Sequence, residues 1–233
     1  KKLARIRDSI AAAVAPGISL RELDELADSL IAKSGGAAAF KLVPGYKWAT
    51  CINLNEGVVH GIPDNKVIKD GDVVSIDVGL YYQGWYTDTS VSVIAGKNTD
   101  PDKKRLLKAG REALVKAIAA ARVGKRVGDI STALETTLQD YGYAPVLTLT
   151  GHGVGKALHE FPPIPGFVKG RVEDTPRLTA GMTLAIEAIY TQGNPETMTL
   201  NDGWTIVTRD GKLAGLFEET VAITDRGPVI LTA

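Results

Sequence analysis

The stretch VVSIDVG at residues 73–79, followed by WYTDTSV at residues 85–91, decides how this chain folds. Each is an apolar and β-branched run of strand length, and each carries one carboxylate, Asp77 in the first run and Asp88 in the second. A turn centred near residues 82–83 would join the runs as a hairpin and bring the two aspartates close to opposite positions. Like charges that face each other across a strand pair destabilise it, and a divalent cation between them would remove the repulsion.

The second half of the chain repeats this arrangement. Glu187 lies inside the apolar run TLAIEAI at residues 183–189, and Glu218 and Glu219 lie inside LFEETVAI at residues 216–223. Strand alternation does not decide which of Glu218 and Glu219 points inward. A charged carboxylate inside an apolar strand is costly unless a partner compensates it, so these residues are further candidate ligands.

The chain has three histidines, and they are the other candidates for a site. His152 lies in GHGVG at residues 151–155, where small neighbours let backbone and ligand approach closely; His159 follows it, and His60 precedes a glycine. A neutral imidazole together with four carboxylates is a suitable ligand set for Mn, Fe, Co or Zn. Taken singly, each residue has a plainer interpretation, since a strand aspartate often bonds to a turn or an arginine and a histidine beside glycine is often a loop residue. The metal hypothesis therefore depends on these features occurring together.

Helical and strand patterns alternate along the chain in the order helices, strands, helices, strands. Ser19 and Glu22 form a capping-box pattern, and Asp100 before Pro101 is typical of a helix start. The pattern predicts helices over residues 1–14, 19–33, 100–122 and 127–141, and strand-rich segments over residues 50–94 and 146–233. We therefore expect an α+β protein in which residues 1–233 form a single catalytic domain of two similar halves, about 1–95 and 96–233, that share one sheet.

Composition argues against several classes of function. Lys plus Arg and Asp plus Glu are equal at 27 each, and the resulting zero net charge argues against a nucleic-acid partner. No apolar run reaches about 18 residues, the length that a transmembrane helix needs, so no membrane partner is expected. The single cysteine, Cys51, allows no intrachain disulfide, as the reducing cytoplasm permits, and we expect it to be a small buried pocket residue. The glycines of residues 151–155 lack the spacing of a dinucleotide fingerprint, and the basic cluster at residues 103–105 is expected to be a solvated helix face.

In their order and spacing, the motifs resemble those of type I methionine aminopeptidases, which are enzymes of the pita-bread fold. The resemblance spans essentially the whole chain, and the matching stretches are residues 55–63, 75–79, 87–89, 151–155, 158–160, 185–187, 202–205 and 218–220. It implies a curved antiparallel sheet covered by helices, in two pseudo-symmetric halves. It also implies a monomeric, cytoplasmic enzyme that removes the initiator methionine from nascent proteins with a small second residue. The ribosome surface is a candidate partner, although the sequence shows no zinc-finger-like N-terminal module for docking there.

The resemblance further implies a centre of two divalent metal ions, drawn from Co, Mn, Fe, Zn and Ni. The ligands that it implies are Asp77, Asp88, His152, Glu187 and Glu218. It favours Glu218 over Glu219 because the family's ligand stands two residues before a threonine, which here is Thr220.

By the same resemblance, each ligand has an expected role. Asp88 and Glu218 would bridge both ions, and Asp77 would chelate one of them. His152 and Glu187 would hold the other ion. Glu187 would also handle the proton of the attacking water.

The resemblance assigns the other two histidines and the apolar residues to the substrate. His159 would stabilise the developing oxyanion, and His60 would contact the substrate amide near the leaving nitrogen. The walls of the methionine pocket would be Phe40, Tyr46, Cys51, Leu158 and Trp204. Residues 40–46 differ from the commonest bacterial pattern, and Leu158 stands where an aromatic residue is usual. Both departures concern the pocket and leave the metal ligands intact.

Two alternative functions follow from the same patterns. An Xaa-Pro aminopeptidase or prolidase would share the fold, but such enzymes usually carry an extra N-terminal domain, and the stretch DGW at residues 202–204 argues against this alternative. A non-catalytic binding protein on the same fold is the second alternative. Such relatives typically lose metal ligands, whereas all of the implied ligand positions are filled here.

Overall fold

An antiparallel sheet forms the frame of the protein in the computed structural model, which describes residues 1–97 and 100–233. The strands of its central path are β1 (Ala37–Ala38), β4 (Val73–Tyr82), β5 (Trp85–Ile94), β12 (Ala214–Thr224), β9 (Thr183–Thr191), β7 (Thr150–Gly153) and β8 (Glu160–Pro165), in this order across the sheet. Shorter strands flank this path, namely β2 (Thr50–Leu54) on β4, β6 (Ala144–Pro145) on β9 and β13 (Gly227–Ile230) on β12. A smaller sheet consists of β3 (Gly57–Val59), β10 (Thr197–Thr199) and β11 (Ile206–Thr208). Two 3₁₀ turns cover Phe40–Leu42 and Val172–Asp174.

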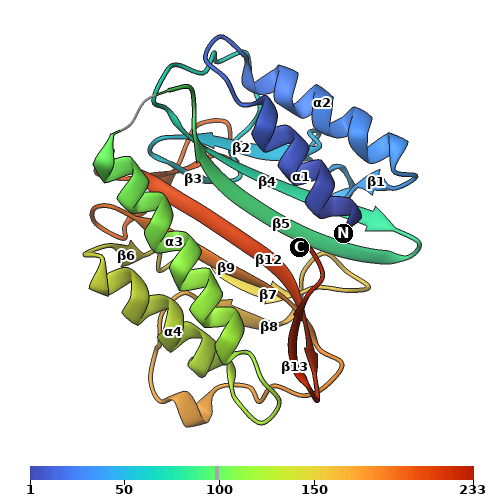
Figure 1. Ribbon diagram of the computed structural model, residues 1–233, viewed down its shortest axis with the longest axis vertical. Helices are drawn as coiled ribbons and strands as arrows, with labels where there is room; N and C mark the ends of the chain where they lie inside the picture. Colours follow the sequence, from blue (N-terminus) through green and yellow to red (C-terminus); the bar gives the residue numbers. More distant parts are fainter. Residues whose placement is uncertain (98–99) are drawn as a thin grey trace.

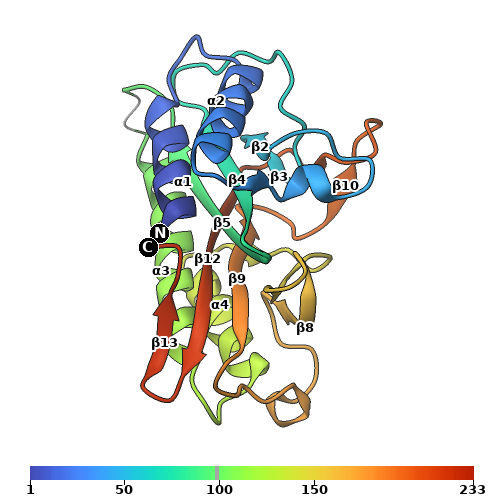
Figure 2. The ribbon, with the colours of Figure 1, turned by 90° about the vertical axis from the view of Figure 1, so that its right-hand side faces the viewer.

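The α-helices of the described residues cover one face of the large sheet (Figure 1). They are α1 (Lys2–Ala13), α2 (Leu20–Lys33), α3 (Pro101–Ala120) and α4 (Val127–Asp140). One apolar core lies between α1, α2 and the strands β4 and β5, and another lies between α3, α4 and the strands β9 and β12. Seen from the side, α1 and α3 lie on one side of the sheet and the smaller sheet lies on the other (Figure 2). The α+β class with an antiparallel sheet and covering helices is therefore confirmed.

Local sequence signals explain where the helices begin. Ser19 accepts a hydrogen bond from the Glu22 amide, and the Glu22 carboxylate accepts one from the Ser19 amide at 2.8 Å, so the predicted capping box is confirmed. Asp100 caps α3 by accepting from the Asp102 amide at 2.8 Å, with Pro101 in the first turn. The predicted helix ends agree with the structure to within two residues. Among the described residues, none of the helices combines the length and apolar character that crossing a membrane requires.

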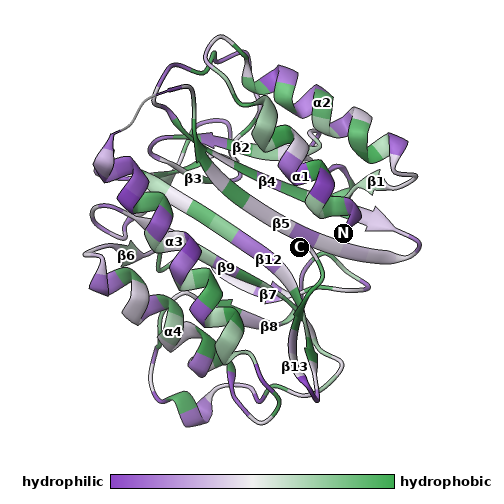
Figure 3. Cartoon of the chain, in the orientation of Figure 1, coloured by the Kyte–Doolittle hydropathy of each residue, from purple (hydrophilic) through white to green (hydrophobic). Residues whose placement is uncertain are grey.

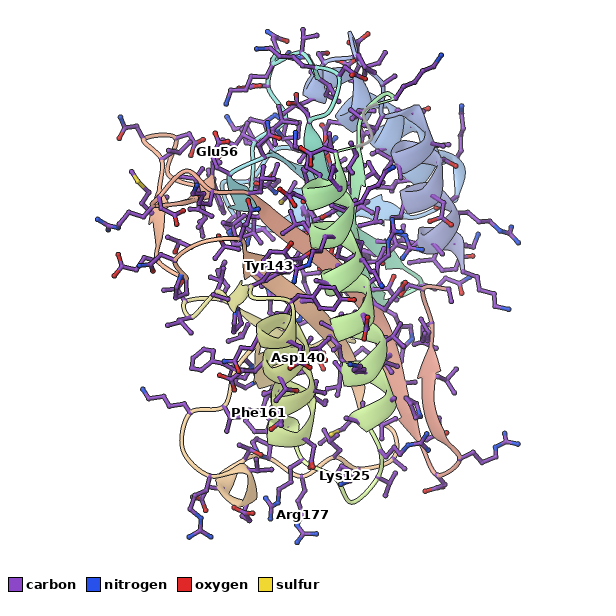
Figure 4. The ribbon with its side chains drawn as sticks, turned by 60° about the vertical axis from the view of Figure 1, so that its left-hand side comes forward. Glu56, Lys125, Asp140, Tyr143, Phe161 and Arg177 are labelled. Atoms are coloured by element: carbon purple, nitrogen blue, oxygen red, sulfur yellow. The ribbon has the colours of Figure 1, made fainter. Side chains whose placement is uncertain are left out.

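Tyr190 fixes α3 against the sheet. Its side chain is fully buried, and its hydroxyl donates to the Leu106 carbonyl at 2.6 Å. The ring fits because position 110 of α3 is glycine, since a Cβ there would lie 2.5 Å from the Tyr190 oxygen. Tyr143, which follows α4 in the chain, lies in the same core with its ring centroid 6.1 Å from that of Tyr190 (Figure 4).

The β4–β5 hairpin differs slightly in register from the predicted one. Asp77 pairs with Ser90 and Asp88 pairs with Gly79, so the two aspartates are diagonal neighbours on one face and not directly opposite. The reason lies in the turn, which is formed by residues 83–84, both with positive φ. A two-residue turn of this kind moves the pairing by one position on each strand relative to a turn centred on residues 82–83.

Candidate metal centre and substrate cavity

One cavity of about 330 Å³ is lined by the side chains that the sequence predicted for the site, with Glu218 but not Glu219 among them. The nominated residues that line it are Phe40, Tyr46, Cys51, His60, Asp77, Asp88, His152, Leu158, His159, Glu187, Trp204 and Glu218. The cavity opens on the face of the sheet away from the helices, because Ile76 and Val78 point into the core beneath α1 and α2 and alternation directs Asp77 to the opposite face.

Asp88 is held firmly at the floor of this cavity. Its side chain is buried, and one carboxylate oxygen accepts a hydrogen bond from the Thr89 amide at 3.0 Å. The Thr220 hydroxyl accepts from the Asp88 amide at 2.9 Å and donates to the Asp88 carbonyl at 2.7 Å. Strand β12 therefore fixes the backbone on which Asp88 stands.

Glu187 and Glu218 face each other directly across β9 and β12, where they are register partners. Like charges in this position repel, so their placement needs a compensating cation or proton. A hydrophilic segment accordingly interrupts the middle of the otherwise apolar β12 (Figure 3). His152 enters from β7, with its Nε2 atom 3.7 Å from a Glu187 carboxylate oxygen.

The neighbours of Glu218 and Glu219 resolve the choice that strand alternation left open. Glu218 is 2% exposed and lines the cavity. Glu219 points to the helix face, where its carboxylate accepts a hydrogen bond from Arg7 at 2.8 Å. The structure thus puts Glu218, the residue that the family resemblance favoured, in the cavity.

The donor set suits a divalent cation. Asp88, His152 and Glu218 can each offer one ligand atom, and these atoms lie within 4.8 Å of one another. The Oδ1 atom of Asp77 and the Oε1 atom of Glu218 are buried without a hydrogen-bond partner, which is costly unless an ion satisfies them. His152 Nδ1 lies 2.8 Å from the Gly153 carbonyl, so a proton on Nδ1 donates there and leaves the lone pair of Nε2 beside Glu187.

The protonation equilibria show how unfavourable this cluster is without a cation. Burial, followed by the charge of neighbouring carboxylates, raises the pKa of Asp77, Glu187 and Glu218 well above their ordinary values. Burial also raises the pKa of Asp88 to about 7. Burial lowers the pKa of His152 to about 4, which keeps its imidazole neutral at pH 7 and able to act as a ligand.

The other two histidines lie at the mouth of the cavity. His60 and His159 are both exposed, and the His159 ring centroid lies 4.4 Å from that of His152. His60 has a positive φ of 57°. This left-handed conformation is uncommon outside glycine, and backbone outliers of this kind cluster at functional sites.

An apolar wall adjoins the carboxylate cluster. The buried residues Phe40, Tyr46, Cys51 and Leu158 form one contact cluster, and the Tyr46 ring packs edge-on against Trp204 with centroids 5.1 Å apart. The Tyr46 hydroxyl donates to the Thr50 carbonyl at 2.8 Å, so the ring cannot turn freely. Cys51 is buried and lines the cavity, which confirms it as a buried pocket residue. Burial raises the pKa of its thiol well above the ordinary value, so it has little thiolate character.

Six further residues line the cavity and were not predicted from the sequence. They are Val43, Val59, Thr148, Leu149, Thr150 and Ile189. Val59 lies inside the matching stretch 55–63, next to His60, and Thr150 lies two residues before His152, so proximity could have suggested them. Ile189 carried no local signal, since it belongs to an apolar run like any other buried strand residue.

Comparisons with known proteins identify relatives of this chain. The sequence model of the family described as Metallopeptidase family M24 matches residues 1–225. The methionine aminopeptidase of Aquifex aeolicus is 45% identical over 240 residues, which cover 99% of this chain and 92% of that protein. The crystal structure of methionine aminopeptidase from Thermotoga maritima is similar with a TM-score of 0.96 and 41% identity, covering 100% of this chain and 92% of that chain. The prolidase from Pyrococcus furiosus has a TM-score of 0.76 and 24% identity, and it shares the fold over 100% of this chain and 62% of its own.

Proposed function

This chain belongs to metallopeptidase family M24 and, within it, to the methionine aminopeptidases, and from that premise we propose that it removes the initiator methionine from nascent proteins whose second residue is small. The enzyme is a metal-dependent aminopeptidase, hence a hydrolase. The observation that carries the proposal is that a cluster of buried carboxylates with one imidazole shares a single cavity with an apolar wall. The prolidase alternative corresponds to a distant relative that is similar in fold alone.

The proposed metal centre holds two divalent ions, chosen from Co, Mn, Fe, Zn and Ni. Asp88 and Glu218 are the proposed bridging ligands, with Asp77 on one ion and His152 and Glu187 on the other. Unpartnered buried oxygens of Asp77 and Glu218 support this assignment. Bound ions would polarise the substrate carbonyl and lower the pKa of the attacking water.

The residues around the centre supply the remaining functions. Glu187, whose pKa burial raises, is the proposed carrier of the proton that the attacking water loses. His159 at the cavity mouth is the proposed donor to the developing oxyanion, and His60 the proposed contact to the substrate amide. Partial desolvation of the ring at the cavity mouth lowers the pKa of His159, so the neutral ring that donates through one N–H is its main form at pH 7.

The apolar wall is the proposed binding surface for the methionine side chain. An unbranched thioether packs well against aromatic rings, and the wall offers Phe40, Tyr46 and Trp204 in edge-on contact. Cys51 and Leu158 complete it with small and branched side chains. The substrate is accordingly the N-terminal methionine of a peptide, with the nascent chain as its source.

Three further features of the protein belong to the proposal. The enzyme is proposed to act in the cytoplasm as a monomer and to bind at the ribosome surface. It is also proposed to consist of one catalytic domain with two similar halves, at about residues 1–95 and 96–233. The separate apolar cores under α1–α2 and under α3–α4 support the division into halves.

The test is release of methionine from Met-Ala-Ser and from a Met-Pro peptide by chelator-treated protein that has been supplied with Mn, Co or Fe, with an Ala-Pro peptide alongside. Methionine release that disappears with chelator and in Asp88→Ala is the expected result. Cleavage of the Ala-Pro peptide without cleavage of Met-Ala-Ser would instead identify an Xaa-Pro enzyme. Bound metal without any cleavage would identify a binding protein.

A further inference from the structure

Strands β5 and β12, which carry Asp88 and Glu218, are joined by a short ladder of paired residues. Strands β5 and β12 share two register pairs, Glu218 with Ser90 and Glu219 with Thr89, whereas β12 and β9 pair over nine positions. We call this contact between β5 and β12 the seam. It joins the strands of the two proposed halves. Asp88 and Glu218, the proposed bridging ligands, lie on its two sides, so their separation depends on how firmly the seam is held.

Side-chain hydroxyls compensate for the short ladder. Thr89 donates to the Glu218 carbonyl at 2.8 Å, and Thr220 donates to the Asp88 carbonyl at 2.7 Å. Ser92 extends the contact by donating to the Leu216 carbonyl and accepting from the Leu216 amide, at 2.8 and 2.9 Å. Cross-strand bonds of this kind hold the backbone on which each ligand stands.

A cation from α1 completes the seam on the helix face. The Arg7 guanidinium donates from one nitrogen to the Thr89 hydroxyl at 2.8 Å and to the Glu219 carboxylate at 2.8 Å. The Arg7 and Glu219 side chains are 12% and 16% exposed, so the ion pair is largely withdrawn from water and strongly directional. The Thr232 hydroxyl donates to the other Glu219 oxygen.

We propose that Arg7 is a positioning residue that fixes the separation of the Asp88 and Glu218 carboxylates by clamping Thr89 and Glu219, their immediate chain neighbours, from the opposite face of the sheet. The inference rests on the proposed metal centre. Adjacent strand residues point to opposite faces, so a contact at residue 89 or 219 holds the ligand next to it without touching the metal. Outer contacts that orient ligands typically change metal affinity by about 10–100-fold when they are removed.

The direction of the change in metal affinity distinguishes a positioning role of Arg7 from a simple effect of its charge. Removing a cation near a metal site strengthens binding of a second cation by Coulomb's law alone. Loosening the seam does the opposite. A loss of metal affinity in Arg7→Met therefore indicates positioning, and a gain indicates charge.

The experiment titrates chelator-treated protein with Mn²⁺ by calorimetry, measures urea unfolding of the same metal-free protein, and compares wild type, Arg7→Met, Thr89→Val and Arg5→Met. Arg5 is an exposed arginine on the same helix and serves as the matched control. Thr89→Val removes the hydroxyl that links Arg7 to the Glu218 carbonyl and leaves both charges in place. We expect Arg7→Met and Thr89→Val to weaken Mn²⁺ binding by about 10–100-fold, and Arg5→Met to bind as wild type does.

The possible results distinguish a failure of this inference from a failure of the proposed function. Wild type that neither binds Mn²⁺ nor releases methionine overturns the proposed function and this inference together. Wild type that binds and cleaves, with Arg7→Met equal to it or tighter, overturns the inference alone. If Arg7→Met does not fold, Thr89→Val decides: weakened binding supports the clamp, and unchanged binding refutes it.

Discussion

Replacing Asp88 by asparagine tests how much unfavourable electrostatic energy the metal-free site contains. Asparagine has the shape of aspartate and keeps an oxygen that can accept the hydrogen bond from the Thr89 amide. What it removes is a buried charge that stands among three other carboxylates. We expect metal-free Asp88→Asn to be more stable than metal-free wild type at neutral pH.

The magnitude follows from the pKa of Asp88, which burial raises from 3.8 to about 7. At about 1.36 kcal/mol for each pKa unit, this change corresponds to about 4 kcal/mol. The sign follows from linkage: a carboxyl with a raised pKa in the folded state binds its proton more tightly when folded than when unfolded. Wild type therefore loses stability relative to Asp88→Asn as pH rises from about 4 to about 7.

The assay is urea unfolding at a series of pH values in the presence of chelator. Asp225→Asn, at an exposed position in the β12–β13 turn, is the control, because it removes a carboxylate that is not buried. Added Mn²⁺ should stabilise wild type and not Asp88→Asn, which reverses the order. A metal-free Asp88→Asn protein that is less stable than wild type at pH 7, or a difference that does not vary with pH, would refute the reasoning.

Three other substitutions have defined expected outcomes. His159→Ala should lower turnover of Met-Ala-Ser by about 10²–10³-fold while bound metal, measured by atomic absorption, is retained. Gly110→Ala should lower the free energy of unfolding by about 1–3 kcal/mol in urea titrations, although alanine favours helix, because its Cβ would lie 2.5 Å from the Tyr190 oxygen. Asp24→Ala should destabilise by about 3 kcal/mol or more, since it leaves two buried amides and the Thr50 hydroxyl without the carboxylate oxygen that they share.

Each of these three substitutions has a control, or a result that would contradict its explanation. Loss of bound metal in His159→Ala would indicate a ligand and contradict its role at the oxyanion. A Gly110→Ala protein as stable as wild type, despite a Cβ within 2.6 Å of both the Phe217 ring and the Tyr190 ring, would contradict the packing argument. Asp24→Asn keeps one acceptor oxygen and should cost less than Asp24→Ala, so equal costs would contradict the hydrogen-bond explanation.

Sequence alone determined much of this protein because its signals are local. The period of apolar residues placed the helices, and the Ser19–Glu22 box set the start of α2. Carboxylates inside apolar strands pointed to the site, because burying a charge demands a partner wherever the strand lies. The family resemblance then joined these residues into one ligand set, whose individual roles stay predictions.

Only the tertiary structure decided the features that depend on contacts between distant segments. Alternation divides β12 into two faces, but the helices packed on one of them determine that Glu218 meets the cavity and Glu219 meets Arg7, 212 residues away in the sequence. The register of the β4–β5 hairpin depended on which two residues adopted positive φ, and Ile189 joined the cavity wall through the fold of the sheet. A local pattern records the chemistry of a residue, whereas its partners are fixed by packing that brings together chain segments with no local relationship.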